Sequence, residues 1–97
     1  MAVNDAGRQV ILIVDDQAGN IALLSDILSD LGDIYFVVDS TLAYDKALEL
    51  QPDVILLDIE MPQLNGFEVC LQLKSSPLTR DISVIFISAR TEAEFEF

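Results

Sequence analysis

A chain of 97 residues is long enough for one domain with a modest core, so we expect residues 1–97 to form a single domain. Seventeen acidic residues against five basic ones give a net charge of −12, which argues against sequence-independent binding to nucleic acid. No apolar run is long enough to cross a bilayer, and no signal-peptide pattern opens the sequence. We therefore expect a cytoplasmic protein with no membrane segment.

Residues 10–14 form the first predicted strand, because this run is apolar throughout and mostly β-branched, as in strands covered on both faces. It ends at Asp15 and Asp16. Apolar residues at helical spacing then predict a helix, with Gly32 as its C-terminal cap. The residues of this apolar stripe are Ile21, Leu24, Ile27, Leu28 and Leu31.

Residues 34–38 form the second predicted strand. Ser40 or Thr41 is expected to cap the helix that follows, because a hydroxyl can accept a hydrogen bond from a free amide at a helix start. Pro52 is expected to end this helix, because proline cannot continue one.

The third predicted strand, residues 54–57, is again apolar and again runs into an acidic residue, Asp58. A loop over residues 59–65 leads through Gly66 to a third helix. Four residues of this helix share one face by their spacing: Phe67, Cys70, Leu71 and Lys74. The single cysteine cannot form an intrachain disulfide, and we expect it to be a packing residue.

Residues 75–77 break the third helix, and residues 84–87 form a fourth strand that ends at Ser88. Thr91 and Glu94 have the spacing of a capping box, which predicts the start of a further helix. Apolar strands that alternate with amphipathic helices pair in parallel, because each helix returns the chain to the same edge of the sheet. The predicted fold class is therefore α/β, with a doubly wound parallel sheet.

Polar side chains follow three of the predicted strands. Ligands of open parallel sheets bind at the carboxyl ends of the strands, which here carry Asp15, Asp16, Asp58 and Ser88. Neighbouring carboxylates repel one another unless a cation lies between them, and Mg²⁺ prefers oxygen ligands and leaves positions open for phosphate. We expect Mg²⁺ at this edge, with Asp58 as a nucleophile towards a phosphoryl group and Ser88 as a hydrogen-bond partner of that group.

Several sequence blocks resemble the signature blocks of response-regulator receiver domains, and the resemblance spans nearly the whole chain. The blocks are residues 11–16, Asn20, residues 52–62, Asn65–Gly66 and residues 84–89. The resemblance implies the flavodoxin-like receiver fold, here with four strands in the order 2-1-3-4.

The resemblance also implies roles for individual residues. Asp58 would be the phosphoacceptor, Asp15 and Asp16 the acidic pair of a Mg²⁺ site, and the main-chain carbonyl of Glu60 the third protein ligand. Ser88 would be the hydroxyl that turns towards the phosphoryl group. The implied donor is a sensor histidine kinase or a phosphotransfer protein, and the chain would be a signalling domain rather than an enzyme.

One departure from the family pattern is that receivers continue into a fifth strand, which ends in a lysine, and a last helix. Lys46 and Lys74 lie on predicted helices and cannot take the place of that lysine. We therefore expect a receiver domain cut short, whose exposed fourth strand associates into a homodimer or larger assembly. Phe95 and Phe97 could pack into the gap left by the missing elements.

Two other functions stay open at this point. The chain could be a receiver-like interaction module that no longer accepts phosphate, which the missing lysine favours. It could also be an aspartate-nucleophile phosphohydrolase, although such enzymes carry an Asp-x-Asp arrangement after their first strand, whereas Asp15 and Asp16 are adjacent.

Overall fold

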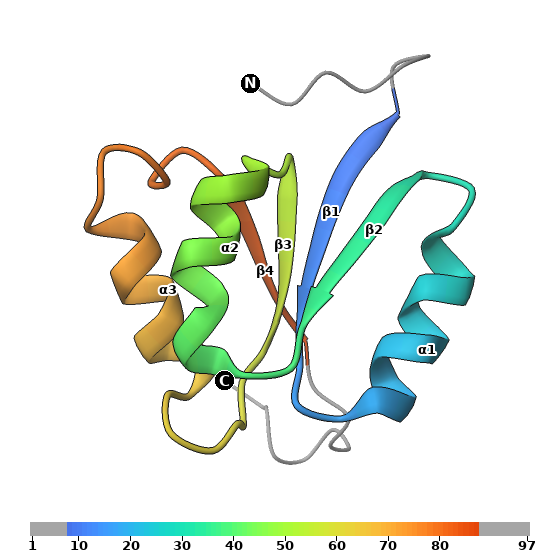
Figure 1. The fold of residues 1–97 in the computed structure, drawn as a ribbon, viewed down its shortest axis with the longest axis horizontal. Helices are drawn as coiled ribbons and strands as arrows, with labels where there is room; N and C mark the ends of the chain where they lie inside the picture. The colour runs from blue at the N-terminus through green and yellow to red at the C-terminus, as the bar shows by residue number, and fades with distance from the viewer. Residues whose placement is uncertain (1–7, 88–97) are drawn as a thin grey trace, which may run out of the picture.

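Strands and helices alternate along the chain in the computed structural model, which describes residues 8–87 (Figure 1). The predictions for Ser88, for the capping box at Thr91 and for Phe95 and Phe97 lie outside these residues. The elements in chain order are β1 (Gln9–Val14), α1 (Ala18–Leu28), β2 (Gly32–Val37), the 3-10 helix η2 (Ser40–Leu42), α2 (Ala43–Leu50), β3 (Val54–Asp58), α3 (Gly66–Lys74) and β4 (Ser83–Ile87).

The four strands form one sheet in the order β2-β1-β3-β4, and every neighbouring pair is parallel. Both the strand order and the α/β class predicted from the sequence are confirmed. Because all strands run the same way, their carboxyl ends lie together at one edge of the sheet. This edge is at the bottom of Figure 1.

Helices cover the two faces of the sheet unequally: α1 lies on one face, and α2 and α3 lie on the other (Figure 1). Leu12, Val14, Ile55 and Leu57 point into the larger core, against α2 and α3. Ile11, Ile13, Ile21 and Leu56 form the smaller core under α1. β1 is buried along nearly its whole length, which explains its unbroken apolar sequence.

The predicted end of the first helix is wrong. α1 ends at Leu28 with Ser29 as its C-cap, and Gly32 opens β2 instead of capping the helix. A Cβ atom on Gly32 would lie 2.2 Å from the carbonyl oxygen of Gln9, so the pairing of β1 with β2 requires glycine here. Ile27 and Leu31, predicted to lie on the buried stripe, are exposed.

The predicted cap of the second helical segment is also wrong. The carboxylate of Asp39, not a hydroxyl of Ser40 or Thr41, accepts the hydrogen bond from the amide of Thr41, at 2.9 Å. Aspartate and serine are comparable caps, and Asp39 occupies the position with extended backbone that a cap requires. The side chain of Ser40 is thereby free to bond elsewhere.

α3 begins with a capping box between Asn65 and Glu68 that the sequence analysis did not identify. Its buried face carries Val69 and Leu73, whereas Phe67 and Leu71, of the predicted shared face, are 54% and 69% exposed. The buried face of α3 is therefore the stripe next to the predicted one. Cys70 is half-buried and packs against the larger core.

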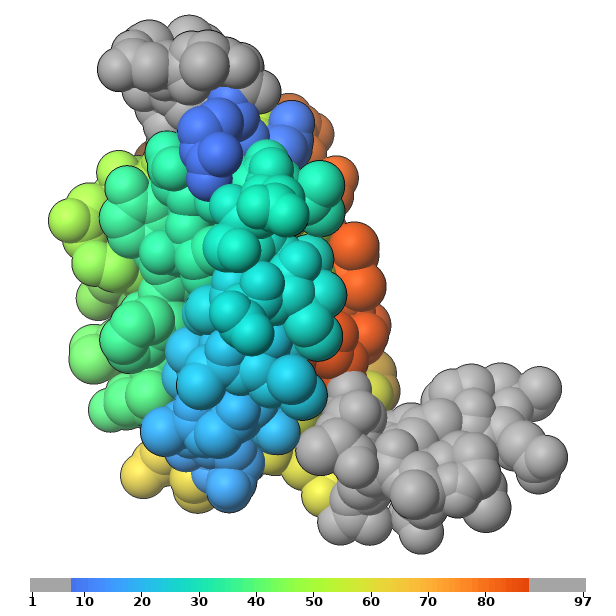
Figure 2. All heavy atoms as spheres, turned by 90° about the vertical axis from the view of Figure 1, so that its right-hand side faces the viewer, coloured from blue at the N-terminus to red at the C-terminus, as the bar shows by residue number. Residues whose placement is uncertain are grey.

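β4 lies at the edge of the sheet, and no other strand in residues 8–87 pairs with its outer side. Ile85 is 52% exposed on the α1 face, where it borders an apolar hollow of about 280 Å³ that Leu28, Leu31 and Leu56 also line. Figure 2 shows β4 in orange-red beside α1. One helix covers only about half the width of four strands, which leaves this hollow open.

None of the helices in the part of the chain that the structure describes is long and apolar enough to cross a membrane.

We predict that Gly32→Ala lowers the free energy of unfolding by about 2 kcal/mol or more, because the new Cβ meets the backbone of Gln9. Gly19→Ala is the matched control: nothing lies within 4 Å of the added Cβ, and alanine in a helix stabilises by about 0.5–1 kcal/mol relative to glycine. Urea unfolding measures both. Equal stability of the two variants would contradict the close approach at Gly32.

Candidate functional site

Three carboxylates converge at the carboxyl edge of the sheet, as the sequence predicted. One oxygen from each of Asp15, Asp16 and Asp58 lies within 4.8 Å of the others. The cause is the register of the two central strands: Val14 pairs with Leu57, so the next residue of each strand is an aspartate at the same level. Asp15 and Asp58 are buried and Asp16 is half-buried.

Hydrogen bonds fix the orientation of Asp15. One carboxylate oxygen accepts from the amide of Gln17 at 2.9 Å, and the other accepts from the side-chain amide of Asn20 at 3.3 Å. The backbone amide of Asp15 donates to Val37 on β2. The turn into α1 therefore presents this carboxylate towards Asp58 with little freedom.

Burial, together with the negative charges of Asp15 and Asp16, raises the pKa of Asp58 to about 6. A hydrogen bond from the amide of Glu60, at 3.4 Å, acts in the opposite direction. The ion pairs within residues 8–87 are Arg8 with Asp33 and Lys46 with Glu49, so no basic side chain of that range pairs with the three aspartates.

The three aspartates fit a small divalent cation. Mg²⁺ binds oxygen at about 2.1 Å in octahedral geometry, so its ligands lie about 3 to 4.2 Å apart. The aspartate oxygens, within 4.8 Å of one another, would move inward to bind it. A cation here would also offset the mutual repulsion that raises the pKa of Asp58.

The loop over residues 59–65 follows Asp58 and is held tightly to it. The amide of Gly66 donates to the carbonyl of Ile59 at 2.8 Å. A Cβ on Gly66 would lie 2.3 Å from the carbonyl oxygen of Asp58, so only glycine permits this approach. Glu60, whose main-chain carbonyl was the predicted third ligand, lies in this loop two residues after Asp58.

Ser40 also holds this loop, and the sequence analysis missed that contact. Its hydroxyl donates to the carbonyl of Pro62 at 3.0 Å and accepts from the amide of Leu64 at 3.2 Å. The sequence offers a small polar residue after the second strand as the only signal, and that signal is equally typical of a helix cap.

The two lysines that precede Ser88 lie on helices, as predicted. Lys46 is paired with Glu49 on α2, and Lys74 donates to the carbonyls of Arg80 and Ile82. Neither lysine forms an ion pair with Asp58.

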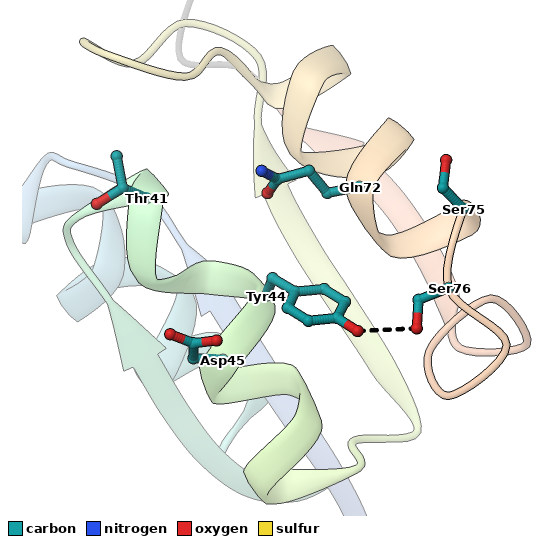
Figure 3. Close-up of a pocket in the computed structure, with 6 residues that line it drawn as sticks. All are labelled: Thr41, Tyr44, Asp45, Gln72, Ser75 and Ser76. Carbon is teal, nitrogen blue, oxygen red and sulfur yellow. Dashed lines mark hydrogen bonds between the residues drawn. The ribbon is translucent and has the colours of Figure 1, made fainter.

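A separate hollow of about 380 Å³ lies between α2 and α3 (Figure 3). The hydroxyl of Tyr44 donates to that of Ser76 across it, at 2.8 Å. Its lining residues are Thr41, Tyr44, Asp45, Gln72, Ser75 and Ser76. None of the three converging aspartates is among them, so this hollow is separate from the acidic site.

Comparison with known proteins places the chain in a family. The model of the response regulator receiver domain matches residues 11–96. A probable cyclic di-GMP phosphodiesterase of Vibrio cholerae is 36% identical over 96 residues, which are 99% of this chain and 22% of that protein. The response regulator PleD of Caulobacter vibrioides is 40% identical over 80 residues, which are 81% of this chain and 18% of that protein.

Solved structures of receiver domains have the same fold as this chain. The N-terminal domain of a response regulator receiver protein from Methanoculleus marisnigri matches with a TM-score of 0.80 and 28% identity, over 84% of this chain and 68% of that one. The chain spans about a fifth of the length of the two curated relatives named above, 22% and 18%. Its fold, its strand-end aspartates and these matches together show that the chain belongs to the response regulator receiver domains.

Proposed function

We propose that this domain accepts a phosphoryl group on Asp58, with Mg²⁺ bound by the neighbouring acidic residues. The observation that carries the proposal is the convergence of Asp15, Asp16 and Asp58 within 4.8 Å at the carboxyl edge of the sheet. A buried cluster of like charges is costly unless a cation is bound. The electrostatic cost of holding these three carboxylates together favours a functional role for them.

The proposed reaction is a transfer from a phosphohistidine to Asp58. A carboxylate oxygen of Asp58 forms a bond to phosphorus, and the bond between phosphorus and the imidazole nitrogen breaks, with its electron pair returning to the imidazole. A pKa of about 6 leaves most Asp58 carboxylates ionised at pH 7, as a nucleophile must be. The amide of Glu60 orients the attacking group.

The proposed ligands of Mg²⁺ are the carboxylates of Asp15, Asp16 and Asp58 and the main-chain carbonyl of Glu60. When bound, the ion would neutralise negative charge on the carboxylate and the phosphoryl oxygens during the transfer. Asp15 is held by Gln17 and Asn20, so it is the ligand with the most fixed position. We also propose the Ser88 hydroxyl as a partner of the phosphoryl group.

The proposed donor is a sensor histidine kinase or a phosphotransfer protein. Receiver domains are in general signalling modules, and we propose that this domain is one rather than an enzyme. Relatives carry names such as phosphodiesterase and methylesterase, and they extend well beyond the matched part, so any such activity would belong to a longer protein.

We predict that incubation with Mg²⁺ and acetyl phosphate adds one phosphoryl group to the chain, detected by intact mass spectrometry. Asp58→Asn should abolish the addition, because the amide is not a nucleophile. Asp15→Asn should reduce it about 10- to 100-fold by weakening the metal site. Removal of Mg²⁺ with EDTA should reduce phosphorylation at least as much as Asp15→Asn does.

Asp45→Asn on α2 is the matched control for the loss of one negative charge, and it should be phosphorylated like the wild type. If the wild type gains no phosphoryl group from small-molecule donors or from a kinase, the phosphoacceptor role is wrong, and the chain is better described as an interaction module. Turnover of a phosphate ester that requires Asp15 would instead favour a phosphohydrolase.

We predict that Asp58→Asn is more stable than the wild type at pH 7 when EDTA is present. The pKa of Asp58 is raised from 3.8 to about 6 by folding, so the folded state binds more protons than the unfolded state between these values. The free energy of unfolding of the wild type therefore falls as pH rises through this window.

The difference in unfolding free energy should reach about 1–2 kcal/mol at pH 7, after allowance for solvent screening, and shrink towards zero near pH 4. Urea unfolding at both pH values measures it. Saturating Mg²⁺ should stabilise the wild type and remove its disadvantage. A variant less stable than the wild type at pH 7 in EDTA would show that the site is not under electrostatic strain.

We propose that the chain associates into a homodimer or larger assembly through the exposed edge of β4. This strand contains no charged residue and no proline, the devices that usually protect edge strands. Phe86 of β4 packs against Phe67 of α3 with tilted rings and 5.0 Å between ring centroids, and both side chains are partly exposed. Two apolar edges can meet without bringing the acidic surfaces into direct contact.

We predict that light scattering shows a mass that rises with protein concentration, and that Ile85→Lys shifts the chain towards the monomer. Leu42→Lys on η2 is the matched control, because Leu42 is also an exposed apolar residue but lies beside β2, at the opposite edge of the sheet. Salt should strengthen association, since it screens repulsion between chains of charge −12. A monomeric mass at every concentration would contradict the proposal.

A further inference from the structure

Ser40 is a buried hydroxyl in an unexpected place. It is the first residue of η2, directly after the cap Asp39, and only 2% of it is exposed. Because the Asp39 carboxylate already accepts from the amide and the hydroxyl of Thr41, Ser40 has no capping role. Its hydroxyl bonds instead to a segment more than 20 residues further along the chain.

Both bonds of this hydroxyl go to the loop that follows Asp58. Ser40 donates to the carbonyl of Pro62 at 3.0 Å and accepts from the amide of Leu64 at 3.2 Å. A single side chain thus satisfies two backbone groups of one loop. Each such bond contributes about 0.5–1.5 kcal/mol.

The residue between Pro62 and Leu64 explains why the two hydrogen bonds from Ser40 matter. Gln63 has φ of 65°, in the left-handed region that a residue with a Cβ enters at a cost of about 1 kcal/mol. The two bonds from Ser40 hold the backbone on both sides of Gln63 and offset this cost. Without them the loop would relax towards more favourable dihedral angles.

A relaxed loop would disturb the acidic site, because the same loop carries Glu60. The amide of Glu60 bonds to Asp58, and the far end of the loop returns to Ile59 through the amide of Gly66. The loop is therefore anchored at both ends and at its middle. Ser40 supplies the middle anchor from a different strand–helix connection.

We propose that Ser40 is a positioning residue for the acidic site: its hydroxyl clamps the loop over residues 59–65 and thereby holds Glu60 and Asp58 in place for the cation. This inference rests on the proposed function, since it concerns the same site. Ser40 itself would contact neither the cation nor the phosphoryl group. It acts through the backbone of Pro62 and Leu64.

The test compares Ser40→Ala with Thr79→Val. Thr79 is also a buried hydroxyl, 1% exposed, and it donates to the carbonyl of Leu73 at 2.6 Å beyond the carboxyl end of α3. Both variants lose one buried hydroxyl and should lose similar stability. Calorimetric titration with Mg²⁺, on protein shown to be folded by circular dichroism, should give about tenfold weaker binding for Ser40→Ala alone.

Phosphorylation by acetyl phosphate should fall in the same variant, and Ser40→Thr, which keeps the hydroxyl, should restore most of the Mg²⁺ affinity. If Ser40→Ala binds Mg²⁺ like the wild type, or if Thr79→Val weakens binding equally, the clamp has no specific role. If the wild type itself fails to bind Mg²⁺ or to gain a phosphoryl group, the proposed function fails instead, independently of the variants.

A measurement on the wild type covers the case in which Ser40→Ala does not fold. Hydrogen exchange of the Leu64 amide, the group bonded to Ser40, should slow when Mg²⁺ is added, because a held loop and a bound cation stabilise each other. The amide of Ser75, at the far end of α3, is the internal reference. An unchanged rate at Leu64 in saturating Mg²⁺ would overturn the coupling.

Discussion

The parallel pairing of β1 with β3 is the constraint on which the rest of the molecule depends. Its register places Val14 opposite Leu57 and so brings Asp15, Asp16 and Asp58 to one level. The burial of these two strands stabilises the pairing, because their side chains fill both cores. The same burial removes water from Asp58 and raises its pKa. Packing therefore favours this arrangement while the repulsion between the carboxylates opposes it, and the proposed cation would relieve that repulsion.

The unequal cover of the sheet follows from the same arrangement. Two helices close the larger core, whereas α1 alone lies on the opposite face, beside β4 (Figure 2). Ile85 of β4 is therefore half-exposed. The acidic site lies at the carboxyl edge and the apolar surface lies beside β4, so the two surfaces differ in both position and chemistry. The proposed phosphoryl transfer uses the acidic site, and the proposed association uses the apolar surface.

The loop that follows Asp58 is held by close backbone contacts and hydrogen bonds. Gly66 approaches the carbonyl of Asp58 so closely that no Cβ fits, and Gln63 adopts a positive φ nearby. These costly conformations are offset by the capping box at Asn65 and by the two bonds of Ser40. Local strain of this kind is common at functional sites, where neighbouring contacts fix a geometry that the loop would not adopt alone.

The sequence by itself determined the fold class, the strand order through family resemblance, and the convergence of the three aspartates. Apolar strands that run into acidic residues are a local pattern, and parallel pairing carries that pattern to one edge. Only the tertiary structure decided which stripes of α1 and α3 are buried, that Gly32 belongs to a strand, and that Asp39 rather than Ser40 caps η2. These outcomes depend on contacts between residues far apart in the chain, such as Gly32 with Gln9 and Ser40 with Pro62, which no local pattern encodes.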